Sequence, residues 1–314
     1  MWSENQQENA IAAAYRKVRI PVLGHAGPRT IAIEDSGDQA ANDIFLCLPG
    51  ILETSKVFAS LDTLLGKGKR IVVVNFAGRA DSDYLPAAAD YRMGTCVADI
   101  VATIAWLRGA LDISAGKLGF IKPPHQRRAP RIHILGNSMG GLLGTHVASR
   151  IPGYVHSLIL NDVGCMLPWS GLVQLFGAIG RASLLQSGSA PARSVAELAR
   201  SLDVDPRLVA AVLNPSHLDL PHASSMQGIG FDESFAAVDI PVLLMYSSAS
   251  ALVTPAVLDR MRAVCVDLRL AALPGERHPL PFDASTAAFI VDFTTEVRGR
   301  QLGDDKPDTR ALDV

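Results

Sequence analysis

The sequence predicts an α/β protein in which a mostly parallel sheet is covered by helices on both faces. Short runs rich in Val, Ile and Leu, such as 44–48 and 70–75, alternate along the chain with segments of helical apolar spacing. Strands that are apolar throughout belong to a sheet buried on both faces, as parallel sheets are. With 314 residues, 48% of them hydrophobic, the chain is long enough for one large domain that carries an inserted segment.

The first half of the chain begins this alternation. In chain order we expect a weakly helical extension (1–16), a β-hairpin (18–23 with 30–34), two buried strands (44–48 and 70–75) and two helices (56–65 and 91–110). The second of these helices is the clearer one, because five apolar residues fall on one of its faces: Val97, Ile100, Val101, Ile104 and Leu107.

The second half continues the pattern. We expect strands over 132–135, 157–160, 241–246 and 264–270, and helices over 142–150 and 283–298. Because these strands are apolar and are separated by helices or long connections, they are expected to lie parallel in the same sheet.

Two segments interrupt the alternation. Residues 112–130 are basic and rich in proline, which predicts a surface loop, with a docking site as the alternative. Residues 165–237 lie between two sheet strands and carry apolar residues at helical spacing. They predict a helical lid inserted in a core made of 1–164 and 238–302. The charged residues 303–314 predict a disordered tail.

Composition argues against several classes of partner and leaves a small-molecule substrate. The net charge of −2 provides no electrostatic attraction to nucleic acid or to an anionic membrane surface. No apolar run reaches the about 18 residues of a transmembrane helix. The polar, acidic N-terminus does not look like a signal peptide, so we expect a cytoplasmic protein. The four cysteines lie far apart, which is typical of buried free thiols: Cys47, Cys96, Cys165 and Cys265.

The most informative motif is Gly-Asn-Ser-Met-Gly-Gly over 136–141. It stands between the apolar strand over 132–135 and the helix over 142–150, which is the arrangement of a nucleophile elbow. Side chains at the flanking glycines would collide where the backbone doubles back. The N-terminus of the following helix faces the serine oxygen and favours developing negative charge. Ser138 is therefore the predicted nucleophile.

A serine nucleophile needs a base and two backbone donors for the oxyanion. Among the eight histidines, His278 is the predicted base because it lies in a loop after the last strand. Loops at the carboxyl ends of parallel strands hold the chemistry of such sheets. We expect one oxyanion donor to be the N–H of Met139. The other is expected in the Pro-Gly turn after the first buried strand, from Ile51, with Leu52 as the alternative.

Together these residues resemble the α/β-hydrolase superfamily over nearly the whole chain. The Pro-Gly of 49–50 is similar to its oxyanion turn, and Gly-Glu-Arg-His of 275–278 is similar to its histidine loop. Asn-Phe-Ala-Gly-Arg-Ala-Asp-Ser-Asp of 75–83 looks like its Gly-rich loop, with Asn75 where Asp is common. The resemblance implies the superfamily's fold, with a lid over the site.

The residues of the elbow motif narrow the resemblance to particular groups within the superfamily. Asn-Ser-Met-Gly-Gly is similar to the elbow of carbon–carbon bond hydrolases of aromatic degradation and of related esterases and lactonases. Ser138 argues against haloalkane dehalogenases and epoxide hydrolases, which place Asp at this position.

The chain departs from the superfamily pattern at the catalytic acid. The loop over 247–255, where the acid usually lies, contains no Asp or Glu, and Ala251 stands at the expected position. The superfamily's other acid position is one strand earlier, where Asp162 ends a strand. We therefore predict Asp162 as the acid. The alternatives are that Asp162 only caps the entrance of the lid, or that His278 is assisted by water or Ser250.

The combined prediction is a serine hydrolase that cleaves an ester or lactone through an acyl-enzyme, with no metal and no organic cofactor. Because the lid is rich in apolar side chains, we expect an apolar acyl part bound by Trp169, Leu172 and Phe176. The lid histidines His217 and His222 lack the neighbours that a metal site needs.

Two alternatives to this function stay open. One is a carbon–carbon bond hydrolase of the meta-cleavage product type, because its elbow is so similar. The other is a non-catalytic ligand-binding or signalling protein on a hydrolase scaffold, because the usual acid is missing. The oligomeric state is also open, with a homodimer among the alternatives.

Overall fold

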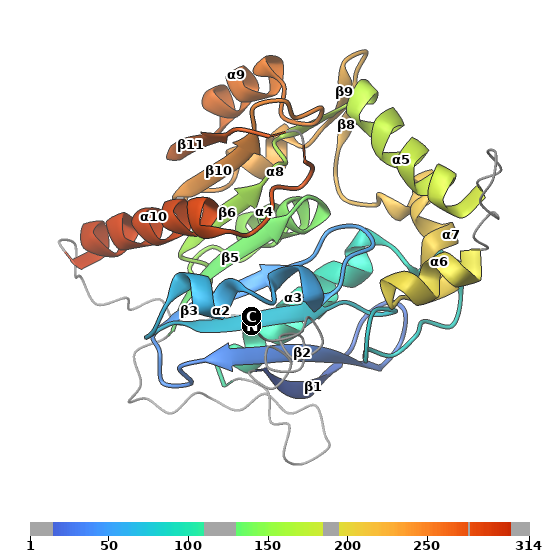
Figure 1. Cartoon of the computed structure of the whole chain (residues 1–314), viewed down its shortest axis with the longest axis horizontal. Helices are drawn as coiled ribbons and strands as arrows, with labels where there is room; N and C mark the ends of the chain where they lie inside the picture. Colours follow the sequence, from blue (N-terminus) through green and yellow to red (C-terminus); the bar gives the residue numbers. More distant parts are fainter. Residues whose placement is uncertain (1–14, 110–129, 185–194, 276, 303–314) are drawn as a thin grey trace, which may run out of the picture.

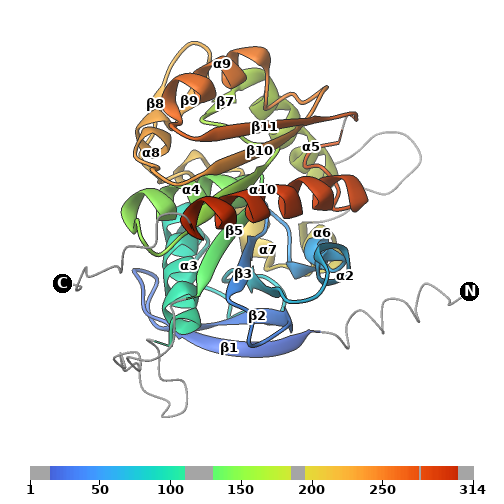
Figure 2. The same ribbon diagram turned by 90° about the vertical axis from the view of Figure 1, so that its left-hand side faces the viewer.

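A central sheet stands between two layers of helices in the computed structural model (Figures 1 and 2). The structure describes residues 15–109, 130–184, 195–275 and 277–302. Three predicted segments lie outside the described residues: most of the extension 1–16, all but the last residue of the basic segment 112–130, and the tail 303–314.

Among the described residues, the central sheet contains eight strands. They are β1 (Arg16–Val22), β2 (Arg29–Gly37), β3 (Asp43–Leu48), β4 (Arg70–Asn75), β5 (Arg131–Asn137), β6 (Ser157–Asn161), β10 (Val242–Ser247) and β11 (Leu268–Leu273). Their order in the sheet is β1-β2-β4-β3-β5-β6-β10-β11. β2 pairs antiparallel with β1 and with β4, and every other pair is parallel. The parallel strands therefore end at one edge, where their carboxyl ends place the site.

Helices cover both faces of the sheet. One layer contains α3 (Met93–Leu107), α4 (Met139–Arg150), α8 (Asp232–Ala236) and α9 (Pro255–Val264), and the other contains α2 (Leu61–Leu65) and α10 (Ala284–Leu302). The alternation of side chains along a strand separates the two cores. In β3, for example, Ile44 and Leu46 pack into the first layer, whereas Phe45 packs into the second. Both faces are covered, so the strands are apolar throughout.

Two predicted elements differ from the structure. The helix expected over 56–65 is a short 3₁₀ turn, Ser55–Phe58, followed by α2. The strand expected over 264–270 begins only at Leu268, because α9 extends to Val264. The start of α9 is specified locally: the Thr254 hydroxyl accepts a hydrogen bond from the N–H of Val257, and proline occupies the first helical position.

The inserted segment 165–237 contains both helices and a small sheet. Its helices are α5 (Trp169–Leu184), α6 (Val195–Leu202), α7 (Pro206–Val212) and a 3₁₀ turn, Pro215–His217. A three-stranded sheet with the order β7-β9-β8 was not predicted, and its strands are β7 (Met166–Pro168), β8 (Ala223–Ser224) and β9 (Gly228–Gly230). These strands have only two or three residues, too few for alternation to reveal them.

Backbone hydrogen bonds attach the middle of this segment to the core. The N–H of Asp205 donates to the carbonyl of Gly78 at 2.7 Å, and the N–H of Ala80 donates to the carbonyl of Asp203 at 2.8 Å. The Tyr91 hydroxyl donates to the Asp205 carboxylate. Figure 1 shows α5, α6 and α7 side by side at one end of the molecule.

His156, in the turn before β6, is expected to make the fold less stable in mild acid. Burial, together with the electrostatic effect of the neighbouring His133 and Arg131, lowers the pKa of His156 to about 4 from the usual 6.5. The folded protein keeps this imidazole neutral where the unfolded chain protonates it. The contribution of neutral His156 to the free energy of unfolding is therefore fully present above pH 6.5. It is lost as the pH falls from 6.5 through 4.

Replacing His156 with Gln should reduce that acid sensitivity. Allowing for the partial exposure of the ring, we expect the difference in unfolding free energy between pH 7.5 and 4.5 to shrink by about 1–2 kcal/mol. Urea unfolding of both proteins at the two pH values measures this difference. The decrease is not removed entirely, because burial also lowers the pKa of His146 and of His217. An equal loss in both proteins would contradict the role of His156.

Candidate active site

Ser138 occupies a sharp turn between β5 and α4. Its backbone has φ +50° and ψ −116°, a strained conformation for a residue with a side chain. The flanking glycines are required by space: a Cβ at Gly136 would lie 2.4 Å from the backbone of Gly141, and a Cβ at Gly140 would lie 2.0 Å from the carbonyl oxygen of Leu48. The turn thus presents the Ser138 hydroxyl at the carboxyl edge of the sheet.

Ser138, His278 and Asp162 form a continuous chain of hydrogen bonds. The Ser138 Oγ lies 2.8 Å from His278 Nε2, and His278 Nδ1 lies 2.8 Å from Asp162 Oδ2. A carboxylate only accepts, so Nδ1 carries the proton and donates it to Asp162. Nε2 is then free to accept from the serine hydroxyl. The imidazole is held in the tautomer that a general base for Ser138 needs.

The carboxylate of Asp162 is fully buried and receives two more hydrogen bonds. The N–H of Ser247 donates to Oδ1 at 3.1 Å, and the hydroxyl of Ser250 donates to Oδ2 at 3.0 Å. Asp162 has φ +56°, in the left-handed region that Asp tolerates better than most residues. The loop after β10, which lacks an acid, therefore supplies donors to the acid at the end of β6.

The expected oxyanion residues lie around the same serine. Met139 is the first residue of α4, so its N–H has no acceptor in the helix. Ile51 lines the pocket together with Ser138, whereas the side chain of Leu52 packs among helices α6 and α7 of the inserted segment. Within the part of the chain that the structure describes, the N–H groups of Ile51 and Leu52 make no hydrogen bond.

Glu53 connects this turn to the elbow. Its Oε2 accepts from the N–H of Gly50 at 2.6 Å and from the side-chain amide of Asn137 at 2.7 Å. The expected oxyanion turn and Asn137, the residue before Ser138, are thus held by one carboxylate oxygen, which fixes their relative position.

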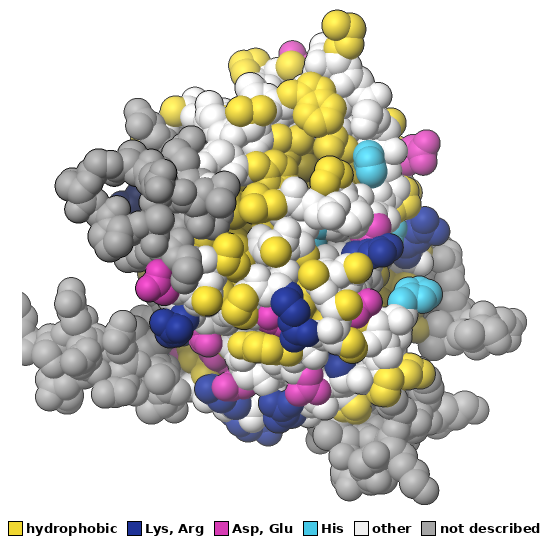
Figure 3. All heavy atoms as spheres, turned by 90° about the vertical axis from the view of Figure 1, so that its right-hand side faces the viewer, with side chains coloured by type: hydrophobic (Ala, Val, Ile, Leu, Met, Phe, Trp, Pro, Cys, Tyr) yellow, Lys and Arg dark blue, Asp and Glu magenta, His cyan; other side chains and the backbone are white. Residues whose placement is uncertain are grey.

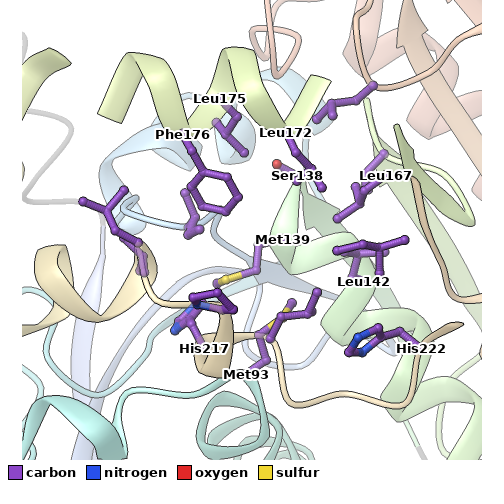
Figure 4. Close-up of a pocket in the computed structure, with 18 of the residues that line it drawn as sticks. Met93, Ser138, Met139, Leu142, Leu167, Leu172, Leu175, Phe176, His217 and His222 are labelled. Atoms are coloured by element: carbon purple, nitrogen blue, oxygen red, sulfur yellow. The ribbon is translucent and has the colours of Figure 1, made fainter. Parts of the chain in front are cut away.

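A pocket of about 590 Å³ opens above Ser138 (Figure 4). Its floor comes from the core, and its roof comes from α5, whose side chains point toward the serine in the figure. The three predicted substrate contacts, Trp169, Leu172 and Phe176, all line it. Most of the lining is apolar: Ile51, Met93, Met139, Leu142, Val163, Leu167, Leu175, Val212 and Leu218.

The mouth of the pocket is apolar as well. Trp169, Val173 and Leu213 line it and remain exposed. Apolar side chains gather on this face of the molecule (Figure 3). The Trp169 indole N–H donates to the carbonyl of Ser225, which ties α5 to the strand pair β8–β9.

Comparison with a family model identifies the family of this protein, and the matched region includes Ser138, His278 and Asp162. The model of the alpha/beta hydrolase family matches residues 45–293, which contain Ser138, Asp162 and His278. The chain belongs to the α/β-hydrolase family. The fold and the family predicted from the sequence are thereby confirmed, and the family identifies the chain as a hydrolase.

Solved structures similar to this α/β hydrolase show the fold alone. An α/β hydrolase from Novosphingobium aromaticivorans superposes with a TM-score of 0.61 at 20% identity, covering 91% of this chain and 99% of that one. A loop variant of a haloalkane dehalogenase from Bradyrhizobium elkanii superposes with a TM-score of 0.62 at 16% identity, covering 92% and 99%.

One curated relative is similar in sequence to this α/β hydrolase. It is a 3-hydroxybutyrate-oligomer hydrolase from Cupriavidus necator, 27% identical over 170 residues. The match covers 54% of this chain and 51% of the relative, so the chain spans about half the length of that protein.

Sequence reasoning missed several residues that hold the site of this α/β hydrolase. Asn161 is fully buried at the end of β6, and its side-chain amide pairs with the carbonyl and the N–H of Leu280, at 2.9 and 3.1 Å. This pair anchors the loop that carries His278. Glu53 acts similarly on the oxyanion turn. A polar residue at the end of an apolar strand is the signal that marks Asn161, but its partner is 119 residues away.

Within the described residues, the other sequence-predicted groups do not assemble a second site. No group of three His, Cys, Asp or Glu side chains there could hold a metal ion. The ring of His217 bonds to the carbonyl of Tyr91, and the ring of His222 bonds to the carbonyl of Leu220. The four cysteines are buried and free, and burial raises the pKa of each thiol. In the same residues, every helix is too short or too polar to cross a membrane.

Proposed function

We propose that this α/β hydrolase is a serine hydrolase that cleaves a carboxylic ester or lactone through an acyl-enzyme. The observation that carries the proposal is the chain of hydrogen bonds from Ser138 through His278 to Asp162 at the base of an apolar pocket. A nucleophile, a base within hydrogen-bond distance and a group that orients the base are the parts that acyl transfer requires.

In the proposed first step, the Ser138 Oγ attacks the ester carbonyl carbon while His278 Nε2 accepts the hydroxyl proton. The carbonyl oxygen becomes an oxyanion, stabilised by the N–H of Met139 and by an N–H of the oxyanion turn, from Ile51 or Leu52. The C–O bond to the alcohol then breaks, and the imidazolium returns its proton to the departing oxygen. Asp162 stabilises the imidazolium through the Nδ1–H and stays ionised throughout.

In the second step, water replaces the alcohol. His278 Nε2 accepts a proton from the water as the water oxygen attacks the acyl carbon, and the proton then passes to Ser138 as the acid is released. In a lactone the departing alcohol stays attached to the acyl part, so one hydroxy acid is the product.

The pocket and the relative together suggest which acyl group the substrate carries. The apolar lining above Ser138 favours an aliphatic acyl group of several carbons. The name of the Cupriavidus necator relative adds short hydroxyacyl esters and their oligomers as a candidate class. Both classes are esters, and Ser138, His278 and Asp162 would cleave both by the two steps given above.

A series of p-nitrophenyl esters tests the proposal. We expect kcat/KM to rise about four-fold for each methylene added between acetyl and hexanoyl, because each buried methylene contributes about 0.8 kcal/mol. The measurement is kcat/KM for each ester at one pH. Equal rates for acetyl and hexanoyl esters would contradict an apolar acyl site, and no turnover of any ester would contradict the esterase.

A matched pair of variants locates the effect in the pocket. Leu172→Ala removes a pocket side chain that is 7% exposed and should flatten the dependence on chain length. Leu107→Ala removes a leucine side chain of similar burial, 9% exposed, on α3 and outside the pocket, and should leave the dependence unchanged.

A further inference from the structure

Arg79 is completely buried and forms no ion pair in the described part of the chain, although the Glu53 and Asp99 carboxylates lie near enough to attract its charge. It lies in the loop after β4, and its guanidinium lies over the ring of Phe76, 5.0 Å from the ring centre. Its Nε and Nη1 make no hydrogen bond among the described residues, and burial lowers the pKa of the guanidinium. Burying a charge without a partner destabilises a fold, so its presence requires another explanation.

The one side-chain hydrogen bond that Arg79 makes in the described residues is to the oxyanion turn. Its Nη2 donates to the carbonyl oxygen of Ile51 at 2.8 Å. The Ile51 carbonyl and the Leu52 N–H belong to one planar trans peptide, so they point in opposite directions. Holding the carbonyl therefore also fixes the direction of that N–H.

The other peptides of the turn are held by Glu53. Its carboxylate accepts from the Gly50 N–H, and its own N–H donates to the Gly50 carbonyl at 3.4 Å. That carbonyl shares a peptide plane with the Ile51 N–H. Arg79 on one side and Glu53 on the other thus determine the orientation of three consecutive peptides beside Ser138.

We propose that Arg79 is a positioning residue that aims the backbone donors of the oxyanion turn at the reacting carbonyl of the substrate. The inference rests on the proposed function, because it concerns the same oxyanion. Arg79 touches neither Ser138 nor the pocket, so it acts through Ile51. Burying the charge of Arg79 destabilises the fold. We infer that the chain nevertheless keeps an arginine here because a donor of this length is needed at the Ile51 carbonyl.

Two substitutions of similar length separate positioning from packing. Arg79→Met replaces the guanidinium with an apolar side chain that cannot donate. Arg79→Lys keeps a donor, because an amine donates to a carbonyl whether it is charged or neutral. Both leave the backbone of the loop unchanged, including the hydrogen bond from the Ala80 N–H to the lid.

We expect Arg79→Met to lower kcat for a p-nitrophenyl ester about 10- to 100-fold and to change KM less than about two-fold. Loss of a complete oxyanion donor costs more, about 10²–10³ in kcat, and misaiming costs a part of that. The inhibition constant of an alkyl boronic acid, which forms a tetrahedral adduct on Ser138, should rise by the same factor. The melting temperature should stay unchanged or rise. Arg79→Lys should keep kcat within about five-fold.

Three outcomes would overturn the inference. An unchanged kcat and inhibition constant in Arg79→Met would show that Arg79 does not aim the donors. Equal losses of kcat and melting temperature in both variants would assign Arg79 to packing alone. A wild-type protein that neither turns over esters nor binds the boronic acid would refute the proposed function itself, and this inference with it. The first two outcomes leave wild-type turnover intact, so the two failures are distinguishable.

Discussion

Replacing Ser138 with Ala is expected to lower kcat for ester hydrolysis by about 10⁵–10⁶. Only the Oγ is removed, which is the atom that attacks the carbonyl in the proposed mechanism. The strained backbone of the elbow is imposed by Gly136 and Gly140, whose close contacts the substitution leaves unchanged. The melting temperature should therefore stay near that of the wild type, and loss of labelling by a fluorophosphonate probe should accompany the loss of turnover.

The protein contains a matched control for this substitution. Ser157 also bonds to a histidine, with its Oγ 2.8 Å from Nδ1 of His133, but it is fully buried at the start of β6. This is the opposite end of the strand from Asp162. Ser157→Ala should leave kcat within about three-fold of the wild type, since no substrate reaches that serine. More than a small fraction of activity in Ser138→Ala would refute the nucleophile.

His278→Ala is expected to reduce kcat about as much as Ser138→Ala does. The two residues act as one unit, so the double variant should be little slower than either single variant. Additive losses in the double variant would mean that Ser138 and His278 do not act through a shared proton transfer.

Replacing Asp162 with Asn is expected to lower kcat by about 10⁴, the size of effect seen when a triad carboxylate is replaced by an amide. An amide no longer requires a proton on His278 Nδ1, so the ring is released into the tautomer that cannot accept from Ser138. The substitution also removes the charge that stabilises the imidazolium. Because Asn is nearly the same size, the fully buried site remains filled.

Moving the carboxylate back to the loop after β10 tests the same role. Sequence similarity pointed to position 251, but Ser250 is the residue whose side chain touches Asp162. In the Asp162→Asn background, Ser250→Asp should therefore restore part of the lost kcat, and more than Ala251→Asp does. If Asp162→Asn kept wild-type activity, Asp162 would be a structural residue. If Ala251→Asp alone then raised kcat strongly, the natural chain would be a weakened catalyst, and the binding-protein alternative would gain support.

The local features of this protein could be predicted because neighbouring residues specify them. The apolar strands, the Gly-x-Ser-x-Gly turn and the α4 helix each depend on a few adjacent positions. The fold and the family follow from their order, and both are confirmed. The start of α9 is equally local, in Thr254 and Pro255, yet no helix was predicted there, and the strand expected over 264–270 began at the last residue of α9.

The support of the oxyanion turn could not be predicted in the same way. Arg79 and Ile51 are 28 residues apart, and nothing adjacent to either residue indicates the hydrogen bond between them. In a loop of Gly, Ala and Asp, an arginine is expected on the surface, because a charge without a partner is rarely buried. Only the folded chain, in which β3 and β4 lie side by side, brings its guanidinium beneath the turn.

The sequence by itself determined that Ser138 stands on an elbow and that His278 follows the last strand. Local backbone geometry decides the first, and chain order decides the second. Which carboxylate faces His278 was decided only by the tertiary structure, because β6 and β10 are neighbours whose carboxyl ends meet at one edge. An acid after either strand reaches the same imidazole there. The chain therefore keeps its carboxylate at Asp162 and uses the loop after β10 to hold it.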